Sequence, residues 1–226
     1  MSGCLIPRIT FIHATRVAID PIEQAVRTIW PEAEVITILE EGLSVDRQKS
    51  PHLSDALCCR IKDLTEYATT LKSDGILFTC SAFGEAIETA AAGSPIPVMK
   101  PNEAMFDAVL AQGDRIAMIY TFPPAAAGME EEFRQAAEAR GRDVELKSYF
   151  CEDAFNAKRA GDNDRHDRLI AQTAQAIADA DVIMLAQFSM AGAADAVRQK
   201  VSVPVLTSPE AAIAELRRRV EAGSTC

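Results

Sequence analysis

Short apolar runs alternate with helix-like stretches along the whole chain. Turn residues bound each apolar run, as is typical of buried strands. The expected strands are Arg8–His13, Glu34–Leu39, Asp74–Phe78, Pro95–Met99, Arg115–Tyr120, Asp143–Tyr149, Asp181–Ala186 and Val203–Leu206. The stretches between them carry helix starts, such as Asp20 as a cap before Pro21 and Ser54, and a helix end at Gly93. Because strands and helices alternate, the sequence predicts an α/β fold with mostly parallel sheets flanked by helices.

The two halves of the chain resemble each other in layout. In each half an opening strand ends in a threonine turn, at Thr15 and at Thr121. In each half a later strand begins with aspartate and ends in a small polar turn, DGILFTCSAFG at 74–84 and DVIMLAQFSMAG at 181–192. The sequence therefore predicts two pseudo-symmetric α/β lobes, residues 1–112 with 205–226 and residues 113–204. The active site is expected in the cleft between the lobes.

Cys80 is the first candidate for chemistry. It follows the apolar run Ile76–Phe78 and precedes a helix start at Gly84, so it is expected beyond the carboxyl end of a parallel strand, where ligands bind. A helix N-terminus beside it would lower the pKa of the thiol and favour the reactive thiolate. The alternative is a small buried hydrophobe, which is the usual role of a free cysteine.

Composition narrows the function classes. The 226-residue chain carries a net charge of −10 and no basic stripe, so nucleic acid is not an expected partner. No apolar run is long enough to span a bilayer, and no signal peptide is expected at the N-terminus. The six cysteines form no CxxC pair, so neither a metal site nor a redox motif is predicted, and a reducing cytoplasmic location is expected. The long polar stretch 40–53 is expected to be an irregular, functional loop.

The order and spacing of several segments resemble the aspartate/glutamate racemase superfamily, which includes hydantoin and allantoin racemases, maleate isomerase and arylmalonate decarboxylase. The segments are the opening strand with its threonine turn, the Cys80 turn, PVMKPNEAM at 97–105, YTF at 120–122, DVIMLAQFSMA and PVLTSPEAA. The resemblance implies an enzyme without metal or other cofactor, in which one thiolate removes the α-proton of a small acid and a second thiol protonates the opposite face.

Cys80 matches the first of the two family cysteines, whereas the second has no match. Gln187 stands at that position, and a shift of two residues would place Ser189 there. Glutamine cannot shuttle protons and serine is a poor acid or base without an activating partner. One-sided chemistry at Cys80 is therefore expected, with Gln187 and Ser189 as the candidates at the second position. It would be proton delivery after decarboxylation, isomerisation through a covalent thiol adduct, or racemisation with a different second group.

Further residues are expected to bind substrate. Thr15 and Thr121 match family positions that bind a substrate carboxylate, and the backbone N–H groups of Ser81 and Ala82 are expected to do the same. The remaining candidates are His13, Phe122 and Phe188. His166 lies in the polar run NDRHDR and is expected on a solvated helix face.

The expected function is that of an isomerase or racemase in amino acid metabolism. It acts at the carbon next to the carboxylate of a small amino acid or related acid, with Cys80 as acid/base thiol. A decarboxylase of a substituted malonate, with Cys80 as proton donor, and a non-catalytic small-acid-binding protein are the alternatives. By analogy with the family, a homo-oligomer is expected.

Overall fold

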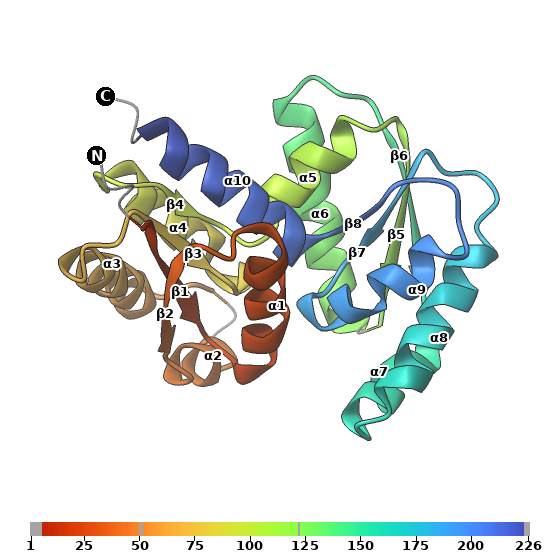
Figure 1. Ribbon diagram of the computed structural model, residues 1–226, viewed down its shortest axis with the longest axis horizontal. Helices are drawn as coiled ribbons and strands as arrows, with labels where there is room; N and C mark the ends of the chain where they lie inside the picture. The colour runs from red at the N-terminus through yellow and green to blue at the C-terminus, as the bar shows by residue number, and fades with distance from the viewer. Residues whose placement is uncertain (1–5, 50–51, 122, 224–226) are drawn as a thin grey trace. The chain divides into compact units, whose positions relative to one another are not determined.

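The computed structural model describes residues 6–49, 52–121 and 123–223 (Figure 1). The chain divides into two compact units. The first unit comprises residues 1–102 and 212–226, and the second comprises residues 103–211. The division falls inside the last helix, α10 (Ser208–Gly223).

The first unit contains four strands and their connecting helices. In chain order they are β1 (Arg8–His13), the 3-10 turn η1 (Arg16–Ala18), α1 (Ile19–Ile29), β2 (Glu34–Leu39), α2 (Gly42–Arg47), α3 (Asp55–Thr70), β3 (Gly75–Phe78), the 3-10 turn η2 (Ser81–Phe83), α4 (Gly84–Ala92) and β4 (Val98–Met99). All pairings between these strands are parallel, and their order in the sheet is β2-β1-β3-β4.

The second unit repeats this plan. Its elements are α5 (Glu103–Leu110), β5 (Arg115–Tyr120), α6 (Pro123–Ala139), β6 (Glu145–Phe150), α7 (Glu152–Arg159), α8 (Asn163–Gln175), β7 (Val182–Leu185), the 3-10 segment η3 (Phe188–Ala193), α9 (Ala194–Arg198) and β8 (Val205–Thr207). The sheet order is β6-β5-β7-β8, again parallel throughout the described strands. This confirms the predicted α/β class with two parallel sheets.

The repeat extends to individual backbone contacts. Asp74 accepts from the backbone N–H of Arg8 at 2.7 Å, and Asp181 accepts from that of Arg115 at 2.9 Å. Thr79 N–H donates to Ile12 in the first sheet, as Ala186 N–H donates to Ile119 in the second. The two members of each of these equivalent positions lie 107 residues apart in the sequence. A constant offset through both inner strands gives a residue-by-residue correspondence between the units.

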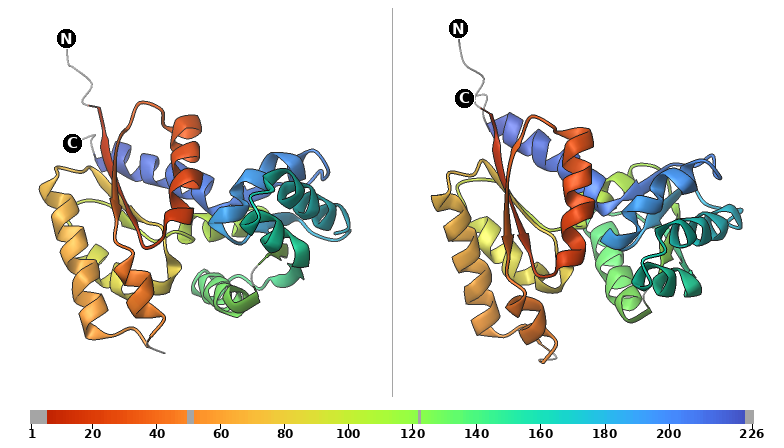
Figure 2. Two further views of the ribbon diagram at one scale, coloured as in Figure 1. Left: turned by 90° about the horizontal axis from the view of Figure 1, so that it is seen from below. Right: turned by 60° about the horizontal axis from the view of Figure 1, so that its bottom comes forward.

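Alternating side chains of the strands build a core on each face of both sheets. In the first unit, Ile76 and Phe78 face α3 and α4, while Gly75 on the opposite face lies against Leu216 of α10. The views in Figure 2 show the strands of this unit between α3 on one side and α1 on the other. In the second unit, Ile183 belongs to the core with α8 and α9, and Met184 to the core with α5 and α6.

Three local predictions differ from the structure. The stretch 40–53 is not wholly irregular, because Gly42–Arg47 forms α2. Asp20 lies inside α1 rather than capping it, since the 3-10 turn η1 leads directly into that helix. The fourth strand is only Val98–Met99, at the edge of its sheet, where Pro97 cannot extend the ladder as a donor.

The predicted lobe boundaries also differ from the observed units. Helix α5 and strand β8, which the sequence assigned to the first lobe, lie in the second unit. The reason is packing: Phe106 of α5 joins the same buried cluster as Val182 of β7, and β8 pairs with β7 in the second sheet.

Candidate active site

Cys80 lies beyond the carboxyl end of β3, an inner strand of the first sheet. Its extended backbone, with φ −125° and ψ 121°, ends the strand and leads into η2, after which α4 begins at Gly84. The thiol is half-buried against the core formed with α3 and α4, while Ser81 and Ala82 after it are exposed. The predicted strand–turn–helix setting of Cys80 is therefore confirmed.

The sequence predicted a lowered pKa for the Cys80 thiol, and this prediction is wrong. Burial raises the pKa of Cys80, and this outweighs a hydrogen bond from the backbone of Ala82 and the positive charge of Arg47, both of which lower it. A helix N-terminus favours the thiolate only where the sulfur keeps its solvation, and here the loss of solvent dominates. In the free protein the thiol form of Cys80 is thus favoured, which is the form that donates a proton.

Arg47 was not identified from the sequence. It closes α2, and its Nε–H donates to the carbonyl oxygen of Ala82 at 3.2 Å. The missing signal was the short helix itself, because a six-residue helix in a polar stretch has too little periodicity to stand out.

His13 and Thr79 form a buried pair beside the Cys80 turn. His13 Nδ1 lies 2.8 Å from Thr79 Oγ1, both side chains are buried, and burial lowers the pKa of His13 to about 4. The imidazole is therefore neutral at pH 7. Its Nε2 atom has no hydrogen-bond partner in the described structure. Because His13 is fully buried, we expect it to support the Cys80 turn through its contact with Thr79 rather than to contact a substrate.

Gln187 occupies the position in the second unit that Cys80 occupies in the first. It follows β7 with an extended backbone, φ −111° and ψ 148°, and leads into η3 as Cys80 leads into η2. The 107-residue offset that relates the sheets relates these two residues as well. The register thus selects Gln187, not Ser189, as the equivalent of the cysteine.

The amide of Gln187 is held in one orientation. Its Oε1 accepts from the backbone N–H of Thr121 at 3.0 Å and from Thr121 Oγ1 at 3.3 Å. A backbone N–H can only donate, so the atom facing it must be the amide oxygen and the NH₂ group must point the other way. That Nε2 is buried without a partner among the described residues. An unmatched buried donor costs about 1–3 kcal/mol, so this group is an available donor for a ligand oxygen.

The other predicted residues have different settings. Thr121 is buried and bound to Gln187, whereas Thr15 is half-buried, lies after β1 at the start of η1 and makes no side-chain capping hydrogen bond. Phe188 and Ser189 are both half-buried, and Phe122 lies outside the described residues. The prediction of a solvated His166 is wrong, because its ring is buried against the core side of α8 and bound to Asp167 at 2.7 Å.

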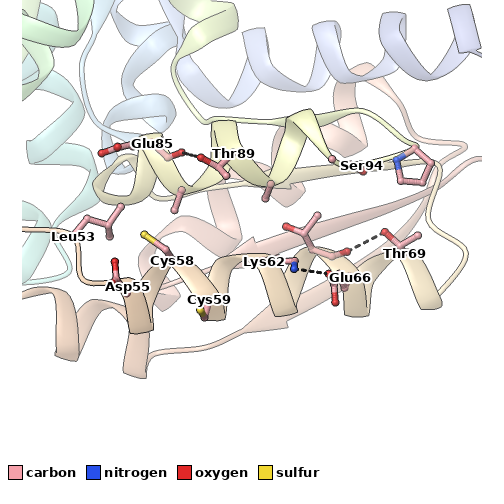
Figure 3. A pocket seen from close by; sticks show the side chains of 15 residues that line it. Leu53, Asp55, Cys58, Cys59, Lys62, Glu66, Thr69, Glu85, Thr89 and Ser94 are labelled. Carbon is pink, nitrogen blue, oxygen red and sulfur yellow. Dashed lines mark hydrogen bonds and ion pairs between the residues drawn. The ribbon is translucent and has the colours of Figure 1, made fainter.

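A groove of about 650 Å³ lies apart from these residues, between α3 and α4 (Figure 3). Cys58 and Cys59 line it, and its threonine hydroxyls bond to carbonyls of their own helices, as Thr89 Oγ1 does to Glu85. None of the predicted site residues lines this groove.

In the described part of the chain, no cluster of three His, Cys, Asp or Glu side chains is placed to hold a metal ion. No helix among the described residues is long and apolar enough to cross a membrane.

Two parallel sheets of identical strand order, with a thiol at the end of one inner strand, define an α/β fold of the racemase type. The chain belongs to the Asp/Glu/Hydantoin racemase family, whose model matches residues 12–216. The family match indicates an enzyme of the racemase or isomerase type.

Solved structures share this fold at low sequence identity. Allantoin racemase from Klebsiella pneumoniae is 16% identical, with a TM-score of 0.69 over 96% of this chain and 89% of that one. An aspartate racemase homologue from Pyrococcus horikoshii OT3 is 14% identical, with a TM-score of 0.70 over 95% and 99%. A mutant of arylmalonate decarboxylase is 18% identical, with a TM-score of 0.67 over 96% and 95%. No curated protein matches the sequence.

Proposed function

We propose that this protein moves a proton at the carbon next to the carboxylate of a small acid, with Cys80 as the acid/base thiol. In an isomerase or racemase reaction, the thiolate takes the α-proton and leaves the electron pair on carbon, and the thiol then returns a proton to that carbon. The observation that carries the proposal is the placement of Cys80 at the end of an inner strand of a racemase-family fold.

The surroundings of Cys80 supply hydrogen-bond donors for the negative charge. Ser81 and Ala82 are exposed in the turn, and we propose that their backbone N–H groups bind a carboxylate or a developing carbanion, that of Ala82 in addition to its hydrogen bond to the Cys80 sulfur. We propose Thr15 and Phe188 as further substrate contacts on the basis of their half-buried positions after β1 and β7. A small carboxylate substrate agrees with the family of the chain.

Decarboxylation of a substituted malonate is the second candidate, and two observations favour it. The second unit offers the Gln187 amide where a racemase of this family would need another acid, and burial favours the protonated form of Cys80. In that reaction the C–C bond breaks, carbon dioxide leaves, and the remaining carbanion takes the proton of the Cys80 thiol on one face. The thiolate regains a proton from water.

Incubation in D₂O distinguishes these reactions. We would follow both enantiomers of aspartate and glutamate, hydantoins, maleate and substituted malonates by NMR and by chiral chromatography. Exchange with loss of optical purity supports a racemase, while loss of one carboxylate with deuterium on a single face supports the decarboxylase.

Cys80→Ala is the test variant, and Cys59→Ser is the matched control because Cys59 is an exposed thiol on α3. We expect the first substitution to lower the rate at least about 100-fold, as is typical for loss of a general acid or base, and the second to leave it unchanged. Equal activity of Cys80→Ala and the parent protein would refute the proposal. Binding of an acid without any turnover would support the non-catalytic alternative instead.

A further inference from the structure

Helix α2 brings a cation to the turn that carries the thiol. Arg47 is half-buried at the end of α2, and its guanidinium donates to the carbonyl oxygen of Ala82 at 3.2 Å. Ala82 lies two residues after Cys80, and its backbone also forms a hydrogen bond to the sulfur. Arg47 and the thiol are thus joined through a single residue of the turn.

Ion pairs fix α2 in this place. Arg60 of α3 contacts Glu40, at the end of β2, and Asp46 of α2, the latter at 2.8 Å. Glu40 also accepts from the backbone N–H of Gly42 at 3.0 Å, at the start of the helix. Each contact is partly buried, so the short helix is anchored at both ends although its length alone would not stabilise it.

Several titratable side chains lie on the elements that adjoin the turn. Glu85 lies in the first turn of α4, Lys100 beyond β4 pairs with Glu88 of α4, and His13 on β1 is neutral because of its burial. The positive charge of Arg47 lowers the pKa of the Cys80 thiol and so acts against the effect of burial. A nearby cation favours the thiolate, which is the reactive form of a cysteine.

We propose that Arg47 is a positioning residue for Cys80, one that fastens the turn after the thiol and supplies the positive charge that stabilises the thiolate. The contribution of Arg47 to catalysis rests on the proposed acid/base role of Cys80. The positive charge of Arg47 would let a half-buried thiol that favours its protonated form reach the thiolate during the proposed reaction. Arg47 itself acts through Cys80 in this proposal and transfers no proton.

The rate of alkylation of Cys80 by iodoacetamide tests the proposal without any substrate. The tryptic peptide that contains Cys80 runs from residue 73 and carries no other cysteine, so mass spectrometry reports this thiol alone. We expect Arg47→Gln to lower the rate at pH 7 by about two- to fivefold, the range for one partly exposed charge, and to move the pH midpoint of the reaction upward. Arg47→Lys should restore most of the rate, because it keeps the charge.

Lys49→Gln is the matched control. Lys49 follows α2 and carries the same charge, but its ammonium group pairs with Asp46 of α2 at 2.9 Å. An unchanged rate and midpoint in Arg47→Gln would overturn the proposal, as would an equal effect of Lys49→Gln. A loss of rate that Arg47→Lys does not restore would also overturn it, since charge would not be the cause. Because the readout is alkylation, these outcomes stay separate from any failure of Cys80 to support turnover.

Discussion

The ring of His13 is held by the hydroxyl of Thr79 at 2.8 Å, with both side chains buried beneath the turn that presents Cys80. The pairing links the end of β1 to the end of β3, two strands that are neighbours in the sheet. Burial keeps His13 neutral in the folded protein. In the unfolded chain the same imidazole is exposed to water and binds a proton at a higher pH.

The first prediction concerns acid stability. The pKa of His13 is about 4 in the folded protein and near its ordinary value of 6.5 in the unfolded chain. Between these values the unfolded chain binds more protons, so stability falls as the pH falls from about 6.5 to 4, by up to about 3 kcal/mol. We expect His13→Asn to flatten this part of the pH profile in urea unfolding experiments.

His52→Asn is the control for that experiment, because His52 is exposed. It should leave the slope between pH 6.5 and 4 unchanged. His166, whose pKa burial also lowers, contributes to the remaining slope. A profile of His13→Asn that coincides with that of the parent protein would show that the pair does not control acid stability.

The second prediction follows from the correspondence of Cys80 and Gln187 in the repeat. Gln187→Cys should place a second thiol at the end of β7 in the setting that Cys80 has at the end of β3. If the proposed function is correct and Gln187 holds the position of the second family acid, we expect this variant to gain deuterium exchange and to lose stereochemical purity of the product. Chiral chromatography after incubation in D₂O measures this.

Ser189→Cys is the comparison for that variant. Ser189 lies two residues after Gln187 and is not equivalent to Cys80 in the repeat. The Ser189→Cys variant should therefore keep the stereochemical purity of the product. Racemisation by Ser189→Cys but not by Gln187→Cys would contradict the assignment of Gln187.

Removal of the Thr121 hydroxyl by Thr121→Val should leave the amide of Gln187 less firmly oriented, since one of the two donors to its Oε1 atom is lost.

The third prediction concerns the contact between β3 and α10. A Cβ atom built on Gly75 would lie 2.8 Å from a methyl carbon of Val220 and 2.9 Å from one of Leu216. We expect Gly75→Ala to lower the free energy of unfolding by about 1–3 kcal/mol through overpacking, as measured by chemical denaturation.

Gly128→Ala is the matched control, since a Cβ atom at Gly128 meets nothing within 4 Å and the residue lies inside α6. This substitution should raise stability by about 0.5–1 kcal/mol, the gain expected from alanine in a helix. Destabilisation of equal size at both glycines would show that contact with α10 is not the reason.

The fourth prediction concerns the start of α3. Ser54 Oγ accepts from the backbone N–H of Leu57 at 3.4 Å and so caps the helix. Ser54→Ala should cost about 1 kcal/mol in unfolding free energy, while Ser54→Asp should cost much less because aspartate is an equally good cap. Equal losses in both variants would indicate that the cap contributes nothing.

The sequence by itself determined the elements and their internal repeat. The apolar runs located β1, β2 and β5 at their observed bounds, and the aspartate-led strands before Cys80 and Gln187 identified the equivalent turns. These features are local, because strand periodicity, helix caps and turn residues act between near neighbours in the chain.

Only the tertiary structure decided the chemical state of the site. The pKa of Cys80 shifts upward because of burial, whereas the sequence predicted a downward shift. Arg47 lies near the thiol because residues 42–47, in a stretch expected to be irregular, form α2. The contacts of His13 with Thr79 and of Thr121 with Gln187 each join residues 66 positions apart. Desolvation and long-range hydrogen bonds depend on which segments pack together, and the spacing of residues along the chain does not contain that information.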